Sequence, residues 1–131
     1  MKPVTSAKAQ PKNRAPSAAN TAELLLLLES GHIYVNAQNG EIFYRDGRKV
    51  PQRTNFFGYK QFVIFHIGKA CTFYTHKAVW IASRGELPVN FEIDHIDHDK
   101  ENNGIGNLQS LPWRINCMKQ KKTQMIEEVA F

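Results

Sequence analysis

The residues best suited to chemistry lie in the segment Phe91–Lys122. Asp94 and His95 end a run with strand-like alternation, and asparagines follow at Asn107 and Asn116. Carboxylate and amide oxygens are hard donors of the kind that Mg²⁺ prefers, and an imidazole can accept a proton from water at neutral pH. Hydrolysis of a phosphodiester needs such a water, neutralisation of charge on the phosphate and help for the departing oxygen. These residue types are able to serve such chemistry.

Each of these residues also has an ordinary structural interpretation. An Asp-His pair at a strand end is more often a surface or turn feature, so Asp94 and His95 indicate little by themselves. Asn107 directly precedes Leu108 and is equally typical of the turn residue that begins a strand. Asn116 alone is an amide on a helix surface. Only the joint spacing favours a site.

The acids Asp97, Asp99 and Glu101 invite comparison with a calcium-binding loop. That template requires a glycine at its sixth position and a bidentate glutamate at its twelfth, where this chain has Asn102 and Leu108. The calcium-loop interpretation therefore fails. These acids more simply shape a solvated loop.

Local patterns predict how the candidate residues are positioned. The sequence indicates a strand over Phe91–Ile96, a polar loop over Asp97–Gly106, a second strand over Leu108–Leu111, and a helix that begins at Pro112 and carries Asn116. Because neighbouring strand residues face opposite sides, a strand end or a bulge has to turn residues 94 and 95 towards one site.

The predicted last helix has one apolar stripe. Leu111, Ile115 and Met118 follow the i, i+4, i+7 spacing. Asn116 lies about 100° further round the helix, so its amide is expected to face the strand pair. Trp80 and Trp113 are both expected to pack in the core.

This order of elements resembles the HNH endonuclease family, whose core is the ββα-metal motif, also called the His-Me finger. The resemblance rests on the Asp-His pair at 94–95, the run Asn-Gly-Ile-Gly-Asn-Leu over 103–108 and the helical Asn116. It covers Phe91–Lys119 closely and extends loosely upstream over residues 75–88. The branch that it resembles most is that of phage and intron homing endonucleases, in which the last motif residue is Asn.

The resemblance implies a metal-dependent endonuclease that nicks or cuts DNA. Asp94, His95, Asn107 and Asn116 would be its catalytic residues. Asp94 and Asn116 would hold one divalent ion, with Mg²⁺ expected and Mn²⁺ as a substitute; His95 would be the general base, and Asn107 would fix the histidine and its loop. The alternative is a DNA-binding module with an inactive HNH fold, and a third is a purely structural domain stabilised by metal.

The upstream half is predicted to contain a helix over Thr21–Glu29 and two hairpins. Asn39-Gly40 is a strong turn signal between residues 32–36 and 41–45, and Gly68-Lys69 is expected to join 61–67 to 70–74. Residues 46–59 read as an exposed loop, and Thr75 as the cap of a helix over 76–84.

The expected fold class is α+β, with small antiparallel hairpins followed by the ββα-metal motif. The domains predicted are a disordered basic tail (1–20), a helix and hairpin region that is a candidate for DNA contact (21–75), the catalytic core (76–122) and a C-terminal tail (123–131).

Charge gives only local support for a DNA partner. The formal net charge is +5, but residues 1–20 hold four cations and no acid, which leaves 13 cations against 12 acids in 21–131. The tail suits nonspecific phosphate contact and simple solubility equally well. A two-stranded ribbon can enter a major groove, so the hairpins are candidates for recognition. The residues predicted to bind DNA phosphates are Arg45, Arg48, Lys49, Arg53, Arg114, Lys119, Lys121 and Lys122.

Several other protein classes are disfavoured. Two cysteines, Cys71 and Cys117, are too few for a thiolate zinc site and read as reduced. The leucine run Leu24–Leu28 is far shorter than the roughly 20 apolar residues of a membrane-spanning helix. We therefore expect a cytoplasmic protein that does not bind membranes. The resemblance implies double-stranded DNA as its partner, and we expect a monomer, with a dimer as the alternative.

Overall fold

The computed structural model describes residues 18–119, which form an α+β fold with small antiparallel sheets. The predicted tail 123–131, Lys121, Lys122 and residues 1–17 lie outside this range. Within it, no helix is long and apolar enough to cross a membrane. The elements are α2 (Ala18–Glu29), β1 (Ile33–Asn36), β2 (Glu41–Tyr44), β3 (Arg53–Thr54), β4 (Lys60–His66), β5 (Lys69–Tyr74), α3 (Thr75–Arg84), β6 (Phe91–His95), the 3₁₀ turn η3 (Ile105–Asn107) and β7 (Leu108–Pro112), followed by helical residues 113–119.

Both predicted hairpins are present. The β1–β2 pair is antiparallel, and Gly40 in its turn has a φ of 79°. The β4–β5 turn is Ile67-Gly68, one residue earlier than predicted, because His66 pairs with Lys69. Both turn residues have positive φ, which is the conformation of a type I′ turn.

The segment 46–59 is more ordered than the exposed loop predicted for it. Val50 is buried in the core, and its N–H donates to the carbonyl of Ile42 at 2.8 Å. This anchor lets β3 pair with β4, which gives the three-stranded sheet β3-β4-β5. A single apolar residue in a polar stretch was too weak a signal to predict the strand.

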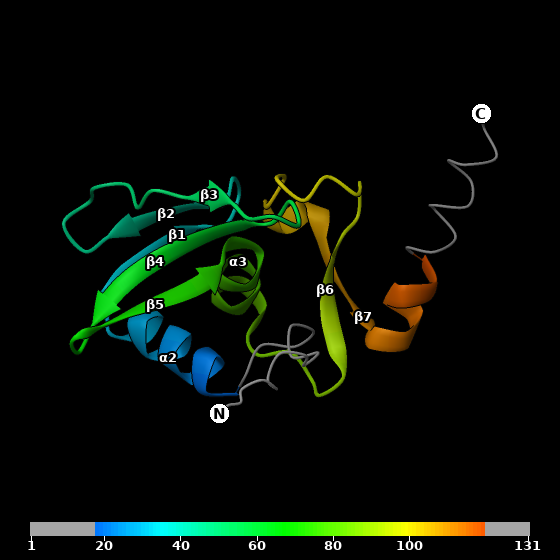
Figure 1. The fold of residues 1–131 in the computed structure, drawn as a ribbon, viewed down its shortest axis with the longest axis horizontal. Helices are drawn as coiled ribbons and strands as arrows, with labels where there is room; N and C mark the ends of the chain where they lie inside the picture. The colour runs from blue at the N-terminus through cyan, green and yellow to red at the C-terminus, as the bar shows by residue number, and fades with distance from the viewer. Residues whose placement is uncertain (1–17, 120–131) are drawn as a thin grey trace, which may run out of the picture.

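Helix α3 supports the two halves of the fold. Ala78 and Ile81 belong to a core cluster with residues of α2 and the upstream strands, including Leu24, Phe62 and Phe73. Its other face carries Val79 and Trp80, which pack with Leu108 of β7 as expected for Trp80. Figure 1 shows α3 between the β4–β5 hairpin and the β6–β7 hairpin. Burial of each such side chain stabilises the fold by about 1.5 to 3 kcal/mol, so α3 fixes the β6–β7 pair against the sheet.

The predicted helix starts need correction. Helix α2 begins at Ala18, so residues 18–20 are helical and the tail predicted over 1–20 is too long. Thr75 is the first residue of α3 and is not its cap. Its side chain is fully buried, and its hydroxyl donates to Oε1 of Gln52 at 2.8 Å. The hydroxyl thus bonds to a residue distant in sequence and does not cap the helix.

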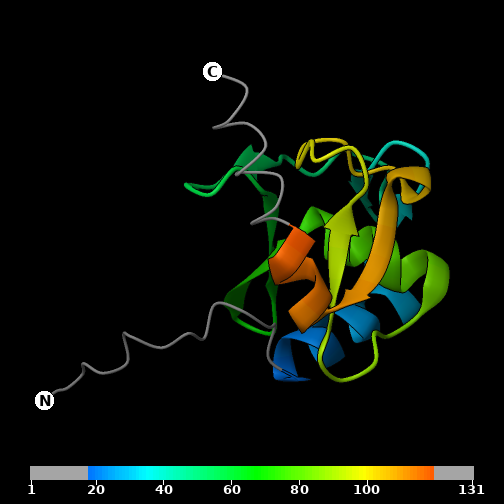
Figure 2. The ribbon, with the colours of Figure 1, turned by 90° about the vertical axis from the view of Figure 1, so that its right-hand side faces the viewer.

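Strand β7 continues through Pro112, which pairs with Phe91, so Pro112 does not begin the last helix. Proline is tolerated there because it is the final residue of a strand at a sheet edge. The helical residues 113–119 follow directly, and Figure 2 shows them against the β6–β7 hairpin, with α3 behind it.

The 113–119 helix packs with its polar side inward. Asn116 is buried, as expected, whereas Ile115 and Met118 of the predicted apolar stripe are 47% and 62% exposed. Trp113 is 40% exposed, so its assignment to the core was wrong. The reason is the strand face that the helix covers, which carries Glu92 and therefore selects polar partners.

The β1–β2 turn is pressed against the loop that follows β6. The N–H of Ile105 donates to the carbonyl of Ala37 at 2.7 Å. A Cβ at Gly104 would lie 2.4 Å from the carbonyl oxygen of Gln38, so only glycine fits there. By contrast, a Cβ at Gly106 would meet nothing within 4 Å.

We predict that Gly104→Ala lowers the free energy of unfolding by about 1 to 3 kcal/mol, because the methyl group must displace backbone. Gly106→Ala is the matched control and should change stability by less than about 0.5 kcal/mol. Urea denaturation measures both. Equal stabilities for the two variants would show that the turn and the loop are not in tight contact.

Candidate active site

His95 is the last residue of β6 and is buried. Its Nε2 lies 2.7 Å from Oδ1 of Asn103. An amide oxygen only accepts hydrogen bonds, so this pairing assigns the ring proton to Nε2 and leaves a lone pair on Nδ1. The structure thus holds His95 in the tautomer whose Nδ1 is able to take a proton.

Asn103 is a candidate positioning residue that the sequence analysis did not identify. It is buried, and its Nδ2 donates to the carbonyl of Glu101 at 3.5 Å. In the sequence it stands in a polar Asn/Gly-rich loop, where asparagines usually make local turns. The adjacent Gly104 is a weak signal in the sequence, and only the structure shows the close backbone approach that fixes this part of the loop.

Aromatic rings surround the inner side of His95. The ring centroid of His76 lies 5.2 Å from that of His95, and the ring centroid of Tyr59 lies 6.1 Å away. Burial is the main cause that lowers the pKa of His76 to about 3, with smaller contributions from His95 and Lys77. Its buried Nδ1 has no hydrogen-bond partner among residues 18–119. His76 is therefore neutral and places no second charge beside His95.

Tyr59 lies beside His95. Its pKa is raised, mainly by burial and then by the charge of Glu92, by Tyr74 and by the charge of Asp94. Its ring approaches that of His95. Neither Tyr59 nor His76 was singled out from the sequence, where both resemble core residues of a sheet and a helix.

Asp94 faces the opposite side of β6 from His95. The register runs from Phe91 to His95 without a bulge, so the predicted bulge is not present and residues 94 and 95 alternate across the strand. The Asp94 carboxylate is buried, and Oδ2 accepts hydrogen bonds from Nε2 of Gln109 at 2.8 Å and from Nζ of Lys119. The ammonium of Lys119 partly compensates its charge.

Asn116 approaches the same face of β6. Its Nδ2 donates to Oε1 of Glu92 at 2.9 Å, one residue pair along the strand from Asp94. Since the amide nitrogen is occupied in this way, Oδ1 is the atom able to act as a ligand. The 113–119 helix thus brings Asn116 and Lys119 to the acidic face of the strand.

Asn107 closes the base of the loop over residues 97–106. Its Oδ1 accepts from the N–H of Asp97 at 3.1 Å, and its Nδ2 donates to Oδ1 of Asp97 at 2.8 Å and to the carbonyl of Asn102 at 2.9 Å. These bonds, with the side chain of Asn102 contributing most, lower the pKa of Asp97 to about 2. Asn107 therefore fixes the loop that carries Asn103.

The acidic face suits a hard divalent cation. Within residues 18–119 no three His, Cys, Asp or Glu side chains gather as a metal cluster, so any metal ion there would need an amide oxygen as well. Asp94 and Asn116 supply a carboxylate and an amide oxygen, which is the donor chemistry of Mg²⁺. The bound ammonium of Lys119 shows that the carboxylate accommodates positive charge at this position.

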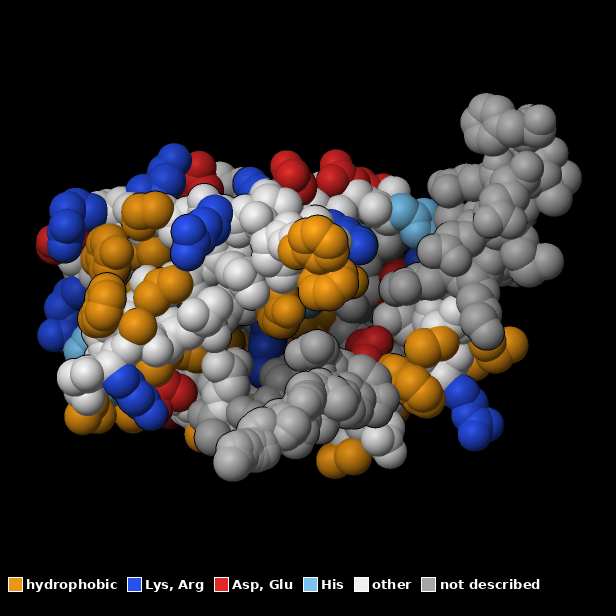
Figure 3. All heavy atoms as spheres, in the orientation of Figure 1, with side chains coloured by type: hydrophobic (Ala, Val, Ile, Leu, Met, Phe, Trp, Pro, Cys, Tyr) orange, Lys and Arg blue, Asp and Glu red, His pale blue; other side chains and the backbone are white. Residues whose placement is uncertain are grey.

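The predicted DNA-binding cations lie in separate places. Arg45 donates to the carbonyls of Ser30 and Gly31 at the end of α2, while Arg48 and Lys49 pair with Asp46 and Glu41 at 2.8 and 3.0 Å. Figure 1 places this turn at the opposite end of the sheet from the loop after β6, and Figure 3 shows several Lys and Arg side chains at that end. Arg53 on β3 and Arg114 on the last helix are exposed.

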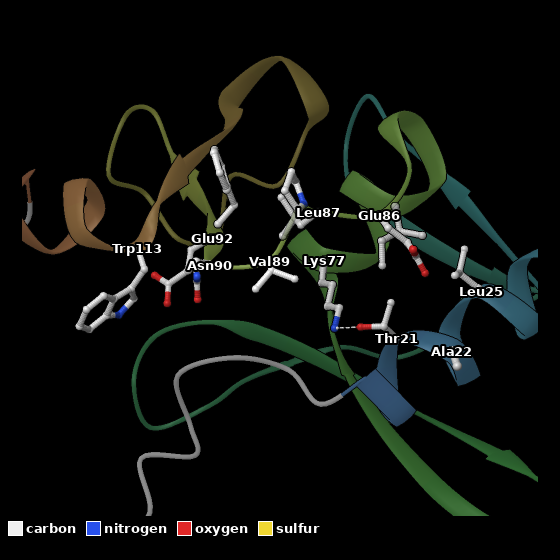
Figure 4. A pocket seen from close by; sticks show the side chains of 13 residues that line it. Thr21, Ala22, Leu25, Lys77, Glu86, Leu87, Val89, Asn90, Glu92 and Trp113 are labelled. Carbon is white, nitrogen blue, oxygen red and sulfur yellow. Dashed lines mark hydrogen bonds between the residues drawn. The ribbon is translucent and has the colours of Figure 1, made fainter.

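A cavity of about 660 Å³ lies between α2, α3 and residues 86–92, and none of the predicted catalytic residues lines it. Lys77 is buried there, and Nζ donates to Oγ1 of Thr21 at 2.7 Å (Figure 4). Burial lowers the pKa of Lys77 to about 8. Lys77 links α3 to α2, and Glu92 is the residue that the cavity shares with the candidate site.

Comparisons with known proteins agree on one family. The HNH endonuclease family matches residues 73–118. A solved structure titled "DNA binding and cleavage by the HNH homing endonuclease I-HmuI" has a similar fold, with a TM-score of 0.62 and 28% sequence identity. The similarity covers 76% of this chain and 62% of that chain, so this protein spans less than two thirds of its structural relative. A search of curated proteins found no match.

We predict that Asn103→Leu removes the tautomer preference of His95 and lowers stability by about 1 to 2 kcal/mol, because a buried hydrogen bond is lost. Asn103→Asp keeps an acceptor and should keep the proton on Nε2. Nitrogen chemical shifts of the imidazole distinguish the tautomers. An unchanged tautomer in Asn103→Leu would mean that another group orients the ring.

We predict that His76 makes the protein less stable as the pH falls from about 6.5 to about 3. The unfolded chain binds a proton at this residue in that range and the native chain does not, so stability declines by up to about 1.4 kcal/mol per pH unit. Urea denaturation at pH 7.5 and pH 5 should show a smaller decline for His76→Phe than for the parent. The exposed His98 gives the control, since His98→Asn should leave the decline unchanged.

Proposed function

We propose that this chain, which belongs to the HNH endonuclease family through its residues 73–118, hydrolyses phosphodiester bonds of double-stranded DNA with one divalent ion bound. The observation that carries the proposal is the buried His95, held by Asn103 at 2.7 Å, at the end of the strand whose other face bears Asp94. The related solved structure is titled for DNA binding and cleavage, which supports the same activity here.

His95 acts as the general base. With the proton of Nε2 held by Asn103, the lone pair of Nδ1 takes a proton from the attacking water. The neutral His76 beside it adds no positive charge that would oppose this transfer. Asn107 contributes through the loop, because its three side-chain hydrogen bonds hold the segment that presents Asn103.

Asp94 and Asn116 hold the divalent ion, expected to be Mg²⁺ with Mn²⁺ as a substitute. When bound, the ion supplies neutralisation of charge at the scissile phosphate and at the departing oxygen. This charge is needed because Glu92 and Asp94 would otherwise repel a phosphate. Lys119, which contacts Asp94, adds a positive charge on the same side.

DNA affinity is proposed to come from phosphate contacts. Arg114 and Lys119 lie on the helix that covers the acidic face, and Arg53 is exposed on β3. Such cations give salt-sensitive binding that positions the duplex without reading its sequence. The more distant Arg45, Arg48 and Lys49 would contact the duplex further from the cleaved bond. A homing-type role, as in the related structure, is part of this proposal.

We predict that the purified protein relaxes or linearises supercoiled plasmid in Mg²⁺ or Mn²⁺ and that His95→Ala slows this at least about 100-fold, because a positioned general base contributes about 10² to 10⁴ in rate. Plasmid binding in a chelator should persist in the variant. Gel analysis of plasmid forms gives the rates, and band shifts give the affinity.

The matched control is His98→Asn, which alters an exposed histidine three residues away and should cleave like the parent. Cleavage by His95→Ala at the parental rate would refute the assignment of the base. Binding by the parent protein without metal-dependent cleavage would instead identify a DNA-binding module with an inactive site.

A further inference from the structure

Two neighbouring phenylalanines stand in solvent on the turn between β3 and β4. Phe56 is 94% exposed and Phe57 is 62% exposed, and their rings meet edge to face with centroids 5.3 Å apart. Burial of an aromatic ring normally stabilises a fold. Two adjacent exposed rings forgo that gain, and such apolar patches mark binding surfaces.

The turn that carries these rings is ordered by its own hydrogen bonds. Oδ1 of Asn55 accepts from the N–H groups of Phe57 and Tyr59 at 2.9 and 3.0 Å, and the N–H of Asn55 donates to the carbonyl of Tyr59 at 2.8 Å. Gly58 completes the turn with a φ of 93°. A rigid turn loses little conformational entropy when its side chains bind.

The same turn is fastened to the loop that holds the candidate base. Nζ of Lys100 donates to the carbonyl of Phe57 at 2.9 Å and lies 4.6 Å from the ring centroid of Tyr59, which itself approaches His95. The hydroxyl of Thr54 donates to Glu101 at 3.4 Å. Figure 1 shows the β3–β4 turn beside this loop, and Figure 2 shows it projecting from the body of the molecule.

We propose that Phe56 and Phe57 form a wedge that inserts at a base step of duplex DNA next to the scissile phosphate. The inference rests on the proposed function and identifies how the site engages its substrate. Apolar side chains inserted between base pairs partly unstack them and kink the duplex. Here the kink brings the phosphate beside the inserted rings towards His95. This follows because Lys100 and Tyr59 join the turn to His95, the proposed general base.

The surroundings of the rings favour DNA over a protein partner. Arg53 is exposed immediately before the turn, and Lys100 lies against it. The cores of protein–protein interfaces are depleted in charged residues, whereas aromatic rings among cations are typical of surfaces that stack on bases and contact phosphates.

The test compares Phe56→Ala/Phe57→Ala with Phe65→Ala, which removes an 80% exposed ring from the other end of β4. The position at which the parent protein cleaves plasmid in Mn²⁺ is mapped first. Unstacking is then measured on a duplex of about 30 base pairs that carries 2-aminopurine beside that position. For this measurement every protein also carries His95→Ala, so that it binds the duplex without cutting it.

In the His95→Ala background, the double variant should lose most of the several-fold rise in 2-aminopurine fluorescence. With His95 intact, the double variant should cleave plasmid at least about tenfold more slowly. Its melting temperature should stay unchanged. Phe65→Ala should match the parent in both measurements. Phe56→Trp should retain the fluorescence rise, because a larger aromatic ring still stacks.

Parental cleavage and parental fluorescence in the double variant would overturn the wedge while leaving the nuclease proposal intact. Loss of self-association in sedimentation, with cleavage unchanged, would assign the rings to a protein interface and also overturn it. A parent protein that neither binds nor cleaves DNA would overturn the nuclease proposal and the wedge with it.

Discussion

The hydrogen bond between His95 and Asn103 is the interaction on which the candidate site depends. It joins the end of β6 to the following loop, and it sets which nitrogen of the imidazole carries the proton. The bond requires a fixed loop. Asn107 closes the base of this loop, and at Gly104 the loop packs closely against the β1–β2 turn. The β1–β2 hairpin, which is far from β6 in the sequence, thus contributes to the position of the His95 ring. The polar bonds of the loop, together with the packing of α3 beneath the strand pair, make the ring position a property of the whole fold.

Strand β6 separates two electrostatic environments. On one side, His95 faces Tyr59 and the neutral His76, where charge is disfavoured by burial. On the other, Glu92 and Asp94 form an acidic face, covered by the polar side of the 113–119 helix. Alternation along an unbulged strand is sufficient to produce this division. It keeps a proton acceptor away from direct carboxylate contact and yet places both groups at the end of the same strand.

Much of the fold and part of the site could be predicted because the signals were local. Asn39-Gly40 specifies its own turn, and the pattern around Asp94 and His95 predicted the strand that carries them. Other features depend on partners distant in sequence. Thr75 forms a hydrogen bond with Gln52, and Asn103 forms one with His95. The apolar stripe of the last helix faces outward because the helix covers an acidic strand face. Periodicity identifies a helix face, but only the opposing surface decides whether the apolar or the polar face is buried.

The acids of the loop also constrain where the proposed DNA duplex can lie. Asp97 and Asp99 each accept a backbone N–H two residues ahead, from Asp99 and Glu101 respectively, so their carboxylates shape the loop. The pKa of Asp97 is lowered to about 2, so this carboxylate stays negatively charged at neutral pH. Phosphates are therefore repelled from the outer surface of this loop. Two other elements approach the end of β6, namely the aromatic β3–β4 turn, which Lys100 joins to the loop, and the last turn of the 113–119 helix, whose Lys119 contacts Asp94. The proposed duplex is directed to these elements, because they carry apolar rings and a cation where the loop carries acids.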